Sequence, residues 1–309
     1  TNTFQGVFMM VLAWGLGLYL PYRLYGGLEP LFMRIATEQP EMLLAPGLSG
    51  DGTAWSWGEY STAVIVSLIG FSMWPHVFMK AFTAKDEQTI KRTVILYPTF
   101  QIFLLPLFII GYCGVFFDPP PPEADQILPH MLMHTEIPAV IVGLFCAGAL
   151  AASMSSGDAM AHAAASIAVR DGYVAGANHE LDPHRERQLI RWTLVLVVVA
   201  SYVVAILYTG SLVVLLLTTY GAVVQFAPAV VAALYLERVS GRAVLTGLVV
   251  GSLVTAALVA FPEARPLAIH AGIYGVLINA ALVIGLSWNT TPSERDRTFI
   301  ATARTPHSG

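Results

Sequence analysis

The stretch from Ala243 to Phe261 contains no Asp, Glu, Lys or Arg. A helix on the surface of a soluble protein needs a polar face, so an apolar stretch of this length is typical of a helix surrounded by lipid. A bilayer core of about 30 Å requires ~20 helical residues to cross it. Comparable apolar runs recur along the sequence and predict spans at about 4–20, 61–79, 94–117, 138–168, 192–208, 211–236, 243–261 and 271–288.

The composition supports a membrane protein and argues against other classes. Hydrophobic residues make up 56% of the 309 residues and charged residues 12%, against about 25% charged residues in a soluble domain. Backbone groups left unpaired in lipid are too costly for anything except helices or closed barrels, and these runs are too continuous for barrel strands. The net charge of −4 excludes a basic nucleic-acid-binding protein. We therefore predict an all-α integral membrane protein with about eight transmembrane helices at 1–288 and a cytoplasmic tail at 289–309.

The basic residues favour one orientation of these spans in the bilayer. If residues 1–3 are cytoplasmic, 13 of the 16 basic residues lie in inside loops and three lie outside, which agrees with the positive-inside bias. This predicts a multi-pass protein of the plasma (inner) membrane with a cytoplasmic C-terminus. The outside residues are Arg23, Arg34 and Arg265, and the inside residues are Lys80, Lys85, Lys91, Arg92, Arg170, Arg185, Arg187, Arg191, Arg238, Arg242, Arg295, Arg297 and Arg304.

The predicted span at 138–168 carries a group of oxygen atoms. Ala152, Ser155 and Ser156 stand at i, i+3 and i+4, so they share one face of a helix. Two hydroxyls and a backbone carbonyl at one point would suit a small hard cation. The alternative is close helix packing, with the hydroxyls bonded back to carbonyls of their own helix. Spacing alone favours the packing alternative.

Three sequence motifs resemble one family of transporters. The run Ala-Ala-Ser-Met-Ser-Ser-Gly-Asp at 151–158, with Arg-Asp-Gly-Tyr at 170–173, resembles the sodium-site helix of the sodium:solute symporter family. Gly-Phe-Ser-Met-Trp-Pro-His at 70–76 is similar to the family's Gly-Gln-Pro-His segment, and its Trp-Pro-His form most resembles the monocarboxylate-permease branch. Gln-Phe-Ala-Pro at 225–228 is the third match. Together the matches touch the whole chain in order.

The resemblance implies a fold and a sodium ion as cofactor. The family has a leucine-transporter-like core of two inverted five-helix repeats, of which the run at 4–20 would be the last helix of the first repeat. The chain is therefore expected to be N-terminally truncated and to hold a partial bundle. On this resemblance Ala152, Ser155 and Ser156 are three sodium ligands, and further carbonyls would come from the first core helix. Asn2 stands near where many relatives have an aspartate; if that aspartate belongs to a second sodium site, its loss argues for one sodium ion here.

A solute site is expected near the second span. Transporters of this kind bind solute at the membrane midplane, beside helices interrupted by Gly or Pro, and Gly70 and Pro75 bracket a stretch where helical hydrogen bonds break easily. A small Gly70 would leave extra room where some relatives have larger aromatic residues. For Phe71, a lipid-facing position is the alternative. Family position implies that Ser67, Gly70, Phe71, Gln101 and Tyr220 line or adjoin the solute cavity.

Asp158 and His162 stand at i and i+4 and could form a proton-relay pair. Counting ~20 residues in from Pro138 places Asp158 at the cytoplasmic boundary of the bilayer. A wetted interfacial pair is therefore the favoured interpretation.

These observations predict a sodium-coupled symporter for a small organic solute that works by alternating access. A monocarboxylate is favoured, and an amino acid or pantothenate is the alternative solute. The alternative function is a transporter-like membrane sensor domain of a signalling protein such as a histidine kinase. An enzyme is not expected, because the sequence has no clustered His, Cys or carboxylate set.

Overall fold

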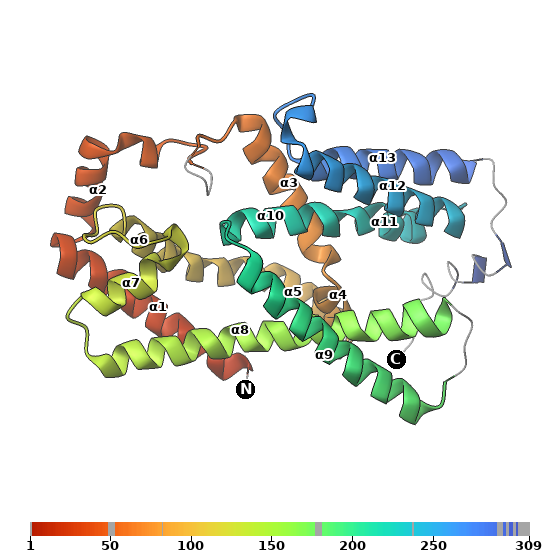
Figure 1. Ribbon diagram of the computed structural model, residues 1–309, viewed down its shortest axis with the longest axis horizontal. Helices are drawn as coiled ribbons and strands as arrows, with labels where there is room; N and C mark the ends of the chain where they lie inside the picture. The colour runs from red at the N-terminus through yellow and green to blue at the C-terminus, as the bar shows by residue number, and fades with distance from the viewer. Residues whose placement is uncertain are drawn as a thin grey trace. The chain divides into compact units, whose positions relative to one another are not determined.

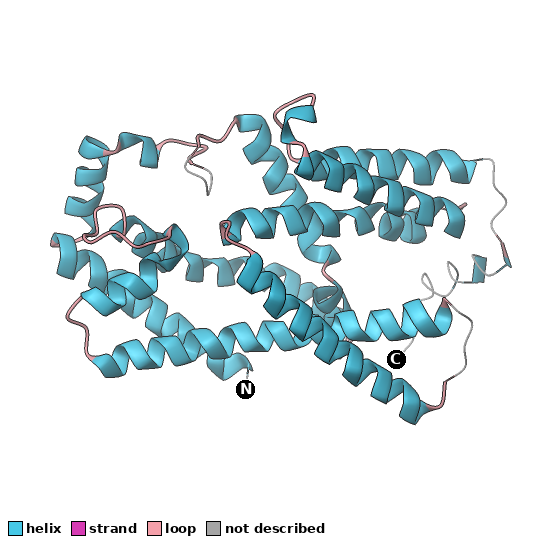
Figure 2. Ribbon diagram, viewed as in Figure 1, coloured by secondary structure: helices cyan, strands magenta, loops and turns pink. Residues whose placement is uncertain are grey.

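Helices make up most of the described part of the protein, as the computed structural model shows (Figures 1 and 2). The structure describes residues 2–48, 53–81, 83–176, 181–236, 238–288, 293–294, 297–298 and 301. Most of the predicted tail at 289–309 lies outside these residues. The chain divides into two compact units, formed by 1–44 with 87–209 and by 45–86 with 210–309.

The first unit is built around α1, which packs against both α6 and α8. Helices α1 and α6 approach closely because α1 has Gly17 at the contact: a Cβ atom there would lie 2.5 Å from Cβ of Pro106. The helices of this unit are α1 (Asn2–Tyr25), α2 (Leu28–Glu38), α5 (Glu87–Phe100), α6 (Leu104–Cys113), α7 (Ile127–His134), α8 (Ala139–Ile167) and α9 (Pro183–Leu207).

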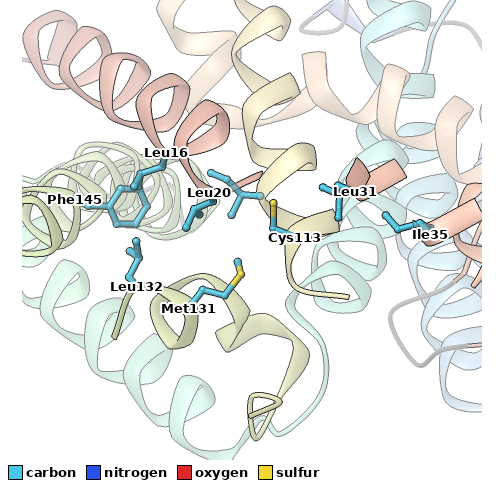
Figure 3. Packing of buried hydrophobic residues seen from close by; sticks show 9 residues of the cluster. Leu16, Leu20, Leu31, Ile35, Cys113, Met131, Leu132 and Phe145 are labelled. Atoms are coloured by element: carbon cyan, nitrogen blue, oxygen red, sulfur yellow. The ribbon is translucent and has the colours of Figure 1, made fainter. Parts of the chain in front are cut away.

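One apolar cluster holds the short helices α2 and α7 onto this frame (Figure 3). Helix α2 buries Leu31 and Ile35, which stand four residues apart and so share one face of the helix. The other members come from α1, α6, α7 and α8, and they are Leu16, Leu20, Ile110, Cys113, Met131, Leu132 and Phe145. The cluster therefore packs α2 and α7 against the longer helices α1, α6 and α8.

In the second unit, α12 and α13 pack along much of their lengths, and α10 and α3 pack together. Glycines at the contact between α12 and α13 let the two backbones approach closely: a Cβ atom on Gly275 would lie 2.5 Å from the Gly251 carbonyl oxygen. The helices of this unit are α3 (Trp57–Met73), α4 (Pro75–Ala81), α10 (Leu212–Val223), α11 (Ala227–Tyr235), α12 (Gly241–Ala260) and α13 (Ala271–Trp288).

Within the described ranges, seven helices are long and apolar enough to cross a membrane, and the bent pair α3–α4 would be an eighth. This agrees with the prediction of about eight spans. Helix α9 has no buried residue, and Trp192, Leu196 and Tyr202 are among its exposed side chains. Such a surface is suited to contact with lipid.

Several helices extend beyond the predicted spans, because hydropathy marks only the part embedded in lipid. Helix α9 begins at Pro183, whereas the predicted span begins at 192. The side chain of Asp182 caps this helix by accepting a hydrogen bond from the backbone N–H of His184 at 3.1 Å. Two charged helical turns therefore precede the apolar part. Helix α1 likewise continues to Tyr25, beyond the predicted end at 20.

Three of the predicted spans are interrupted. The helix pair α3–α4 bends by 52° at Trp74, which has an extended ψ of 123° because the following Pro75 disfavours helical geometry before it. The span predicted at 94–117 is divided by the 3-10 turn η2 (Gln101–Phe103), and that predicted at 211–236 by the 3-10 turn η5 (Val224–Phe226). These breaks are where backbone groups become available for other partners.

Candidate functional site

The oxygen atoms predicted on the fourth span lie in the middle of α8. The Ser155 hydroxyl donates a hydrogen bond to the Ala152 carbonyl oxygen at 2.8 Å, so two of the three predicted ligands are brought together. Ala152 and Ser155 are half-buried, whereas Ser156 is exposed. This bond between Ser155 and Ala152 is the one expected from the alternative of close helix packing, in which a serine hydroxyl bonds back to a carbonyl of its own helix. It also holds two oxygens at a separation that one cation could contact from a single side.

Helix α1 faces this part of α8. A Cβ atom on Gly148 of α8 would lie 2.6 Å from Sδ of Met9 and 3.2 Å from Cε1 of Phe8, so the two helices nearly touch there. They run in opposite directions (Figure 1), so Gln5, one turn before Met9, comes to the level of Ala152, one turn after Gly148.

Gln5 is a polar side chain that the sequence analysis did not select as a ligand. Its Oε1 atom is buried and has no hydrogen-bond partner within the described part of the chain. An amide inside an apolar helix is the signal that could have identified it. A buried acceptor without a donor is costly, so Gln5 Oε1 is a further oxygen in this region of α1 and α8.

The second unit brings together Gly70 of α3 and Tyr220 of α10, both predicted near the solute. A Cβ atom on Gly70 would lie 3.0 Å from Cδ1 of Tyr220 and 3.4 Å from its backbone oxygen. The Tyr220 ring also meets Trp74 edge-on, with 5.9 Å between ring centroids. The expectation that Gly70 leaves extra room is therefore wrong in this conformation, because the Tyr220 ring occupies the space.

The remaining predicted solute residues are less enclosed. Ser67 is half-buried on α3, and Phe71 is 37% exposed on the same helix. Gln101 is exposed and belongs to the first unit, where it begins the turn η2 that interrupts the third span. Of the five residues, the structure thus places Gly70 and Tyr220 in direct contact.

Asp158 and His162 are both exposed on α8. The imidazole Nδ1 of His162 lies 3.4 Å from the Ser166 hydroxyl. The wetted interfacial pair stays a prediction.

A second polar cluster lies where α3 begins. The backbone N–H of His270 donates to the Thr62 hydroxyl at 2.8 Å, and the backbone N–H of Gly272 donates to His270 Nδ1 at 3.1 Å. Nδ1 is therefore an acceptor, which requires the neutral imidazole with its proton on Nε2. Nearby, Arg265 and Glu59 form an ion pair at 3.7 Å.

This cluster predicts a pH dependence of stability. Burial lowers the pKa of His270; a hydrogen bond to the Leu217 backbone opposes this, Arg265 lowers the pKa further and Glu59 raises it. Because the folded pKa is depressed, the unfolded chain binds the proton first as the pH falls through about 6.5, and folding stability declines from there downward. We expect the melting temperature in detergent to fall between pH 7.5 and 5, and His270→Gln to reduce that fall. An equal fall in both proteins would contradict this role.

Comparisons with known proteins agree with the resemblance seen in the three sequence motifs. A model of the sodium:solute symporter family matches residues 1–251. The chain belongs to the sodium:solute symporter family. It is 25% identical to the uncharacterised symporter YhjB of Bacillus subtilis, over 93% of this chain and 60% of that protein. It is 22% identical to the sodium/pantothenate symporter of Haemophilus influenzae, over 81% of this chain and 51% of that protein.

A solved structure of a Na+-coupled sialic acid symporter, in its substrate-bound outward-open state, has the same fold with a TM-score of 0.68. The identity is 18%, and the match covers 94% of this chain and 62% of that one. This chain thus spans about half to three fifths of the length of these symporters. The family and the seven apolar helices identify a multi-pass membrane protein with a transporter fold. Within the described residues no three His, Cys, Asp or Glu side chains are grouped to hold a metal ion.

Proposed function

We propose that this chain is the part of a sodium-coupled symporter that holds sodium with Ala152, Ser155 and Ser156 of α8. The observation that carries the proposal is the sodium:solute symporter match over residues 1–251, which contains these three residues. The Ser155 hydroxyl lies 2.8 Å from the Ala152 carbonyl, so two of the proposed ligand oxygens are adjacent. Sodium prefers oxygen ligands, and a bound ion would replace the hydroxyl proton as the partner of that carbonyl. Gln5 Oε1, buried on the helix packed against α8, is a further oxygen in reach of the same region.

We infer that the solute site lies beside the broken helix α3–α4. Interrupted helices offer backbone groups to a solute at the membrane midplane. The Tyr220 ring packs against Gly70 of this helix. Ser67, Phe71 and Gln101 are the other proposed solute residues. The relatives named for sodium, pantothenate and sialic acid support a small organic solute. A monocarboxylate remains our first choice among such solutes, on the Trp-Pro-His sequence at 74–76.

The driving force follows from the charges that move. Carrying one charge inward across 100 mV releases ~2.3 kcal/mol, and a tenfold sodium gradient adds ~1.4 kcal/mol. Together they could sustain roughly 500-fold accumulation of a neutral solute. A monocarboxylate taken up with one sodium ion carries no net charge, so it gains only the gradient share. The proposed alternating-access cycle takes place in the plasma membrane, with the C-terminus cytoplasmic.

The proposal is tested with the full-length protein in proteoliposomes, against acetate, lactate, pyruvate, proline and pantothenate. We expect an inward sodium gradient to drive uptake of a monocarboxylate at a rate that an inside-negative potential leaves unchanged, because one sodium ion balances one carboxylate. Choline in place of sodium is the control. Uptake that proceeds equally well with choline would exclude sodium coupling, and potential-driven uptake of proline alone would exclude the monocarboxylate.

A further inference from the structure

The break between α10 and α11 carries a buried amide that none of the proposed roles uses. Gln225 is fully buried in the turn η5. Its side-chain Nε2 lies within hydrogen-bond distance of three acceptors on three helices: the Gly221 carbonyl at 3.1 Å, the Thr255 hydroxyl at 3.2 Å and the Gly272 carbonyl at 3.2 Å. One side chain thus joins α10 to α12 and α13.

Asn279 of α13 meets the same turn from the other direction. It is 1% exposed, and its Nδ2 donates to the backbone oxygen of Gln225 at 2.7 Å. Pro228, three residues further along the chain, has no N–H to donate to this carbonyl as a 3-10 turn would require, and in a membrane interior such a group must be paired within the protein. Asn279 supplies that pairing from outside the broken helix.

Three other carbonyls near the break, those of Tyr220, Ala222 and Val224, accept backbone hydrogen bonds. The backbone N–H of Ala227 bonds to the Val224 oxygen, and the backbone N–H of Val224 bonds to the oxygens of Tyr220 and Ala222. The Tyr220 carbonyl is therefore hydrogen-bonded directly to Val224, the first residue of the turn that Gln225 and Asn279 hold. The same carbonyl lies 3.4 Å from the Cβ position of Gly70.

Helix α12 offers a close fit to both amides. A Cβ atom on Gly251 would lie 2.6 Å from Gln225 Oε1, and one on Gly247 would lie 2.5 Å from Asn279 Oδ1. Each oxygen fits against α12 because that helix has a glycine at the contact. Neither oxygen has a hydrogen-bond partner in the described ranges. Because α12 and α13 pack along much of their lengths, the pair forms a firm support for the turn.

We propose that Gln225 and Asn279 are positioning residues, which fix the break after α10 and thereby hold Tyr220 against Gly70 at the solute site. This inference rests on the proposed function, since Tyr220 is a solute residue only there. On this proposal α12 and α13 contribute to solute recognition by supporting the turn η5, although none of the proposed solute residues lies on either helix.

The test replaces Asn279 by leucine, which keeps the volume of the side chain and removes its donor. Ser287→Ala is the matched control: Ser287 is also buried on α13 and accepts a hydrogen bond from the Ser240 N–H at 3.3 Å, away from the break. Asn279→Ala removes the same donor with a smaller side chain, in case the leucine variant does not fold. All variants are made in the full-length protein.

Hydrogen exchange followed by mass spectrometry reports the anchor directly. In both Asn279 variants we expect the backbone amides of residues 223–227 to exchange about tenfold faster or more, the change expected when one buried hydrogen bond is lost, and Ser287→Ala to leave them unchanged. The KM for the solute should rise roughly fivefold or more, whereas 22Na+ binding without solute should stay within about twofold of wild type.

The outcomes separate the two proposals. If amides 223–227 exchange in the Asn279 variants as they do in Ser287→Ala, the anchor does not exist. If they exchange faster while the KM for the solute keeps its wild-type value, the break does not position Tyr220, and the inference is equally overturned. A wild-type protein without sodium-dependent uptake defeats the proposed function instead, and the exchange experiment still decides whether the anchor exists.

Discussion

Replacing both Ser155 and Ser156 by alanine is expected to lower sodium-dependent uptake by the full-length protein about 100-fold or more at limiting sodium. Each hydroxyl is proposed to contact a charged ion, and a contact of this kind contributes about 1.5–3 kcal/mol. Two such losses exceed ~2.8 kcal/mol, the free energy of a 100-fold change. The measurement is the initial rate of solute uptake as a function of sodium concentration in proteoliposomes.

Ser153→Ala is the matched control for this experiment. Its hydroxyl donates to the Ala149 carbonyl at 2.9 Å, so it has the same chemistry on the same helix, but it lies outside the proposed ligand set. We expect sodium dependence within about twofold of wild type, as is usual for an exposed substitution. If the double Ser155/Ser156 variant has the same sodium affinity as the control, Ser155 and Ser156 are not sodium ligands.

The observed bond between Ser155 and Ala152 is consistent with either role of α8. Without an ion, a serine hydroxyl in an apolar helix bonds back to its own backbone, and Ser155 does so. An ion would take the lone pairs of both oxygens and turn the hydroxyl proton away. The sodium dependence of uptake therefore distinguishes packing from ligation.

Much of the fold follows from the sequence because lipid imposes a simple rule. Uncharged runs of sufficient length must be helices, and the run predicted at 271–288 coincides with α13. The break before Pro75 also follows locally, because proline restricts the residue before it. The early start of α9 at Pro183 does not follow, since hydropathy says nothing about helical turns that leave the bilayer.

The parts of the candidate site that were missed depend on which helices pack together. Tyr220 occupies the space beside Gly70, and no spacing within either segment indicates that contact. In the sequence Gln225 belongs to the Gln-Phe-Ala-Pro motif and Asn279 to none of the motifs, and an amide in an apolar run predicts a buried partner but not its identity. The oxygens of α8 could be predicted as a group because they lie within one helical turn.

Gly275→Ala should have the largest effect on stability, lowering the free energy of unfolding by about 3 kcal/mol. A Cβ atom at this position of α13 would collide with the Thr255 hydroxyl and would lie 2.5 Å from the Gly251 carbonyl oxygen and 2.9 Å from Gln225 Nε2. The carbonyl belongs to the backbone of α12, so the clash is relieved only if the two helices separate. The Thr255 hydroxyl, which donates to the Gly251 carbonyl within α12 at 2.9 Å, would also have to turn away from the added methyl group and lose that bond.

The same helix offers a control that isolates this clash. A Cβ atom on Gly285 of α13 would meet nothing within 4 Å, and alanine is favoured over glycine in a helix by up to about 1 kcal/mol. Gly285→Ala should therefore leave the melting temperature in detergent unchanged or raise it, whereas Gly275→Ala lowers it. Equal melting temperatures for the two variants would mean that α12 and α13 do not pack at the separation described. The anchor at Gln225 and Asn279 would then lose its support as well, because both amides lie against the glycines of that contact.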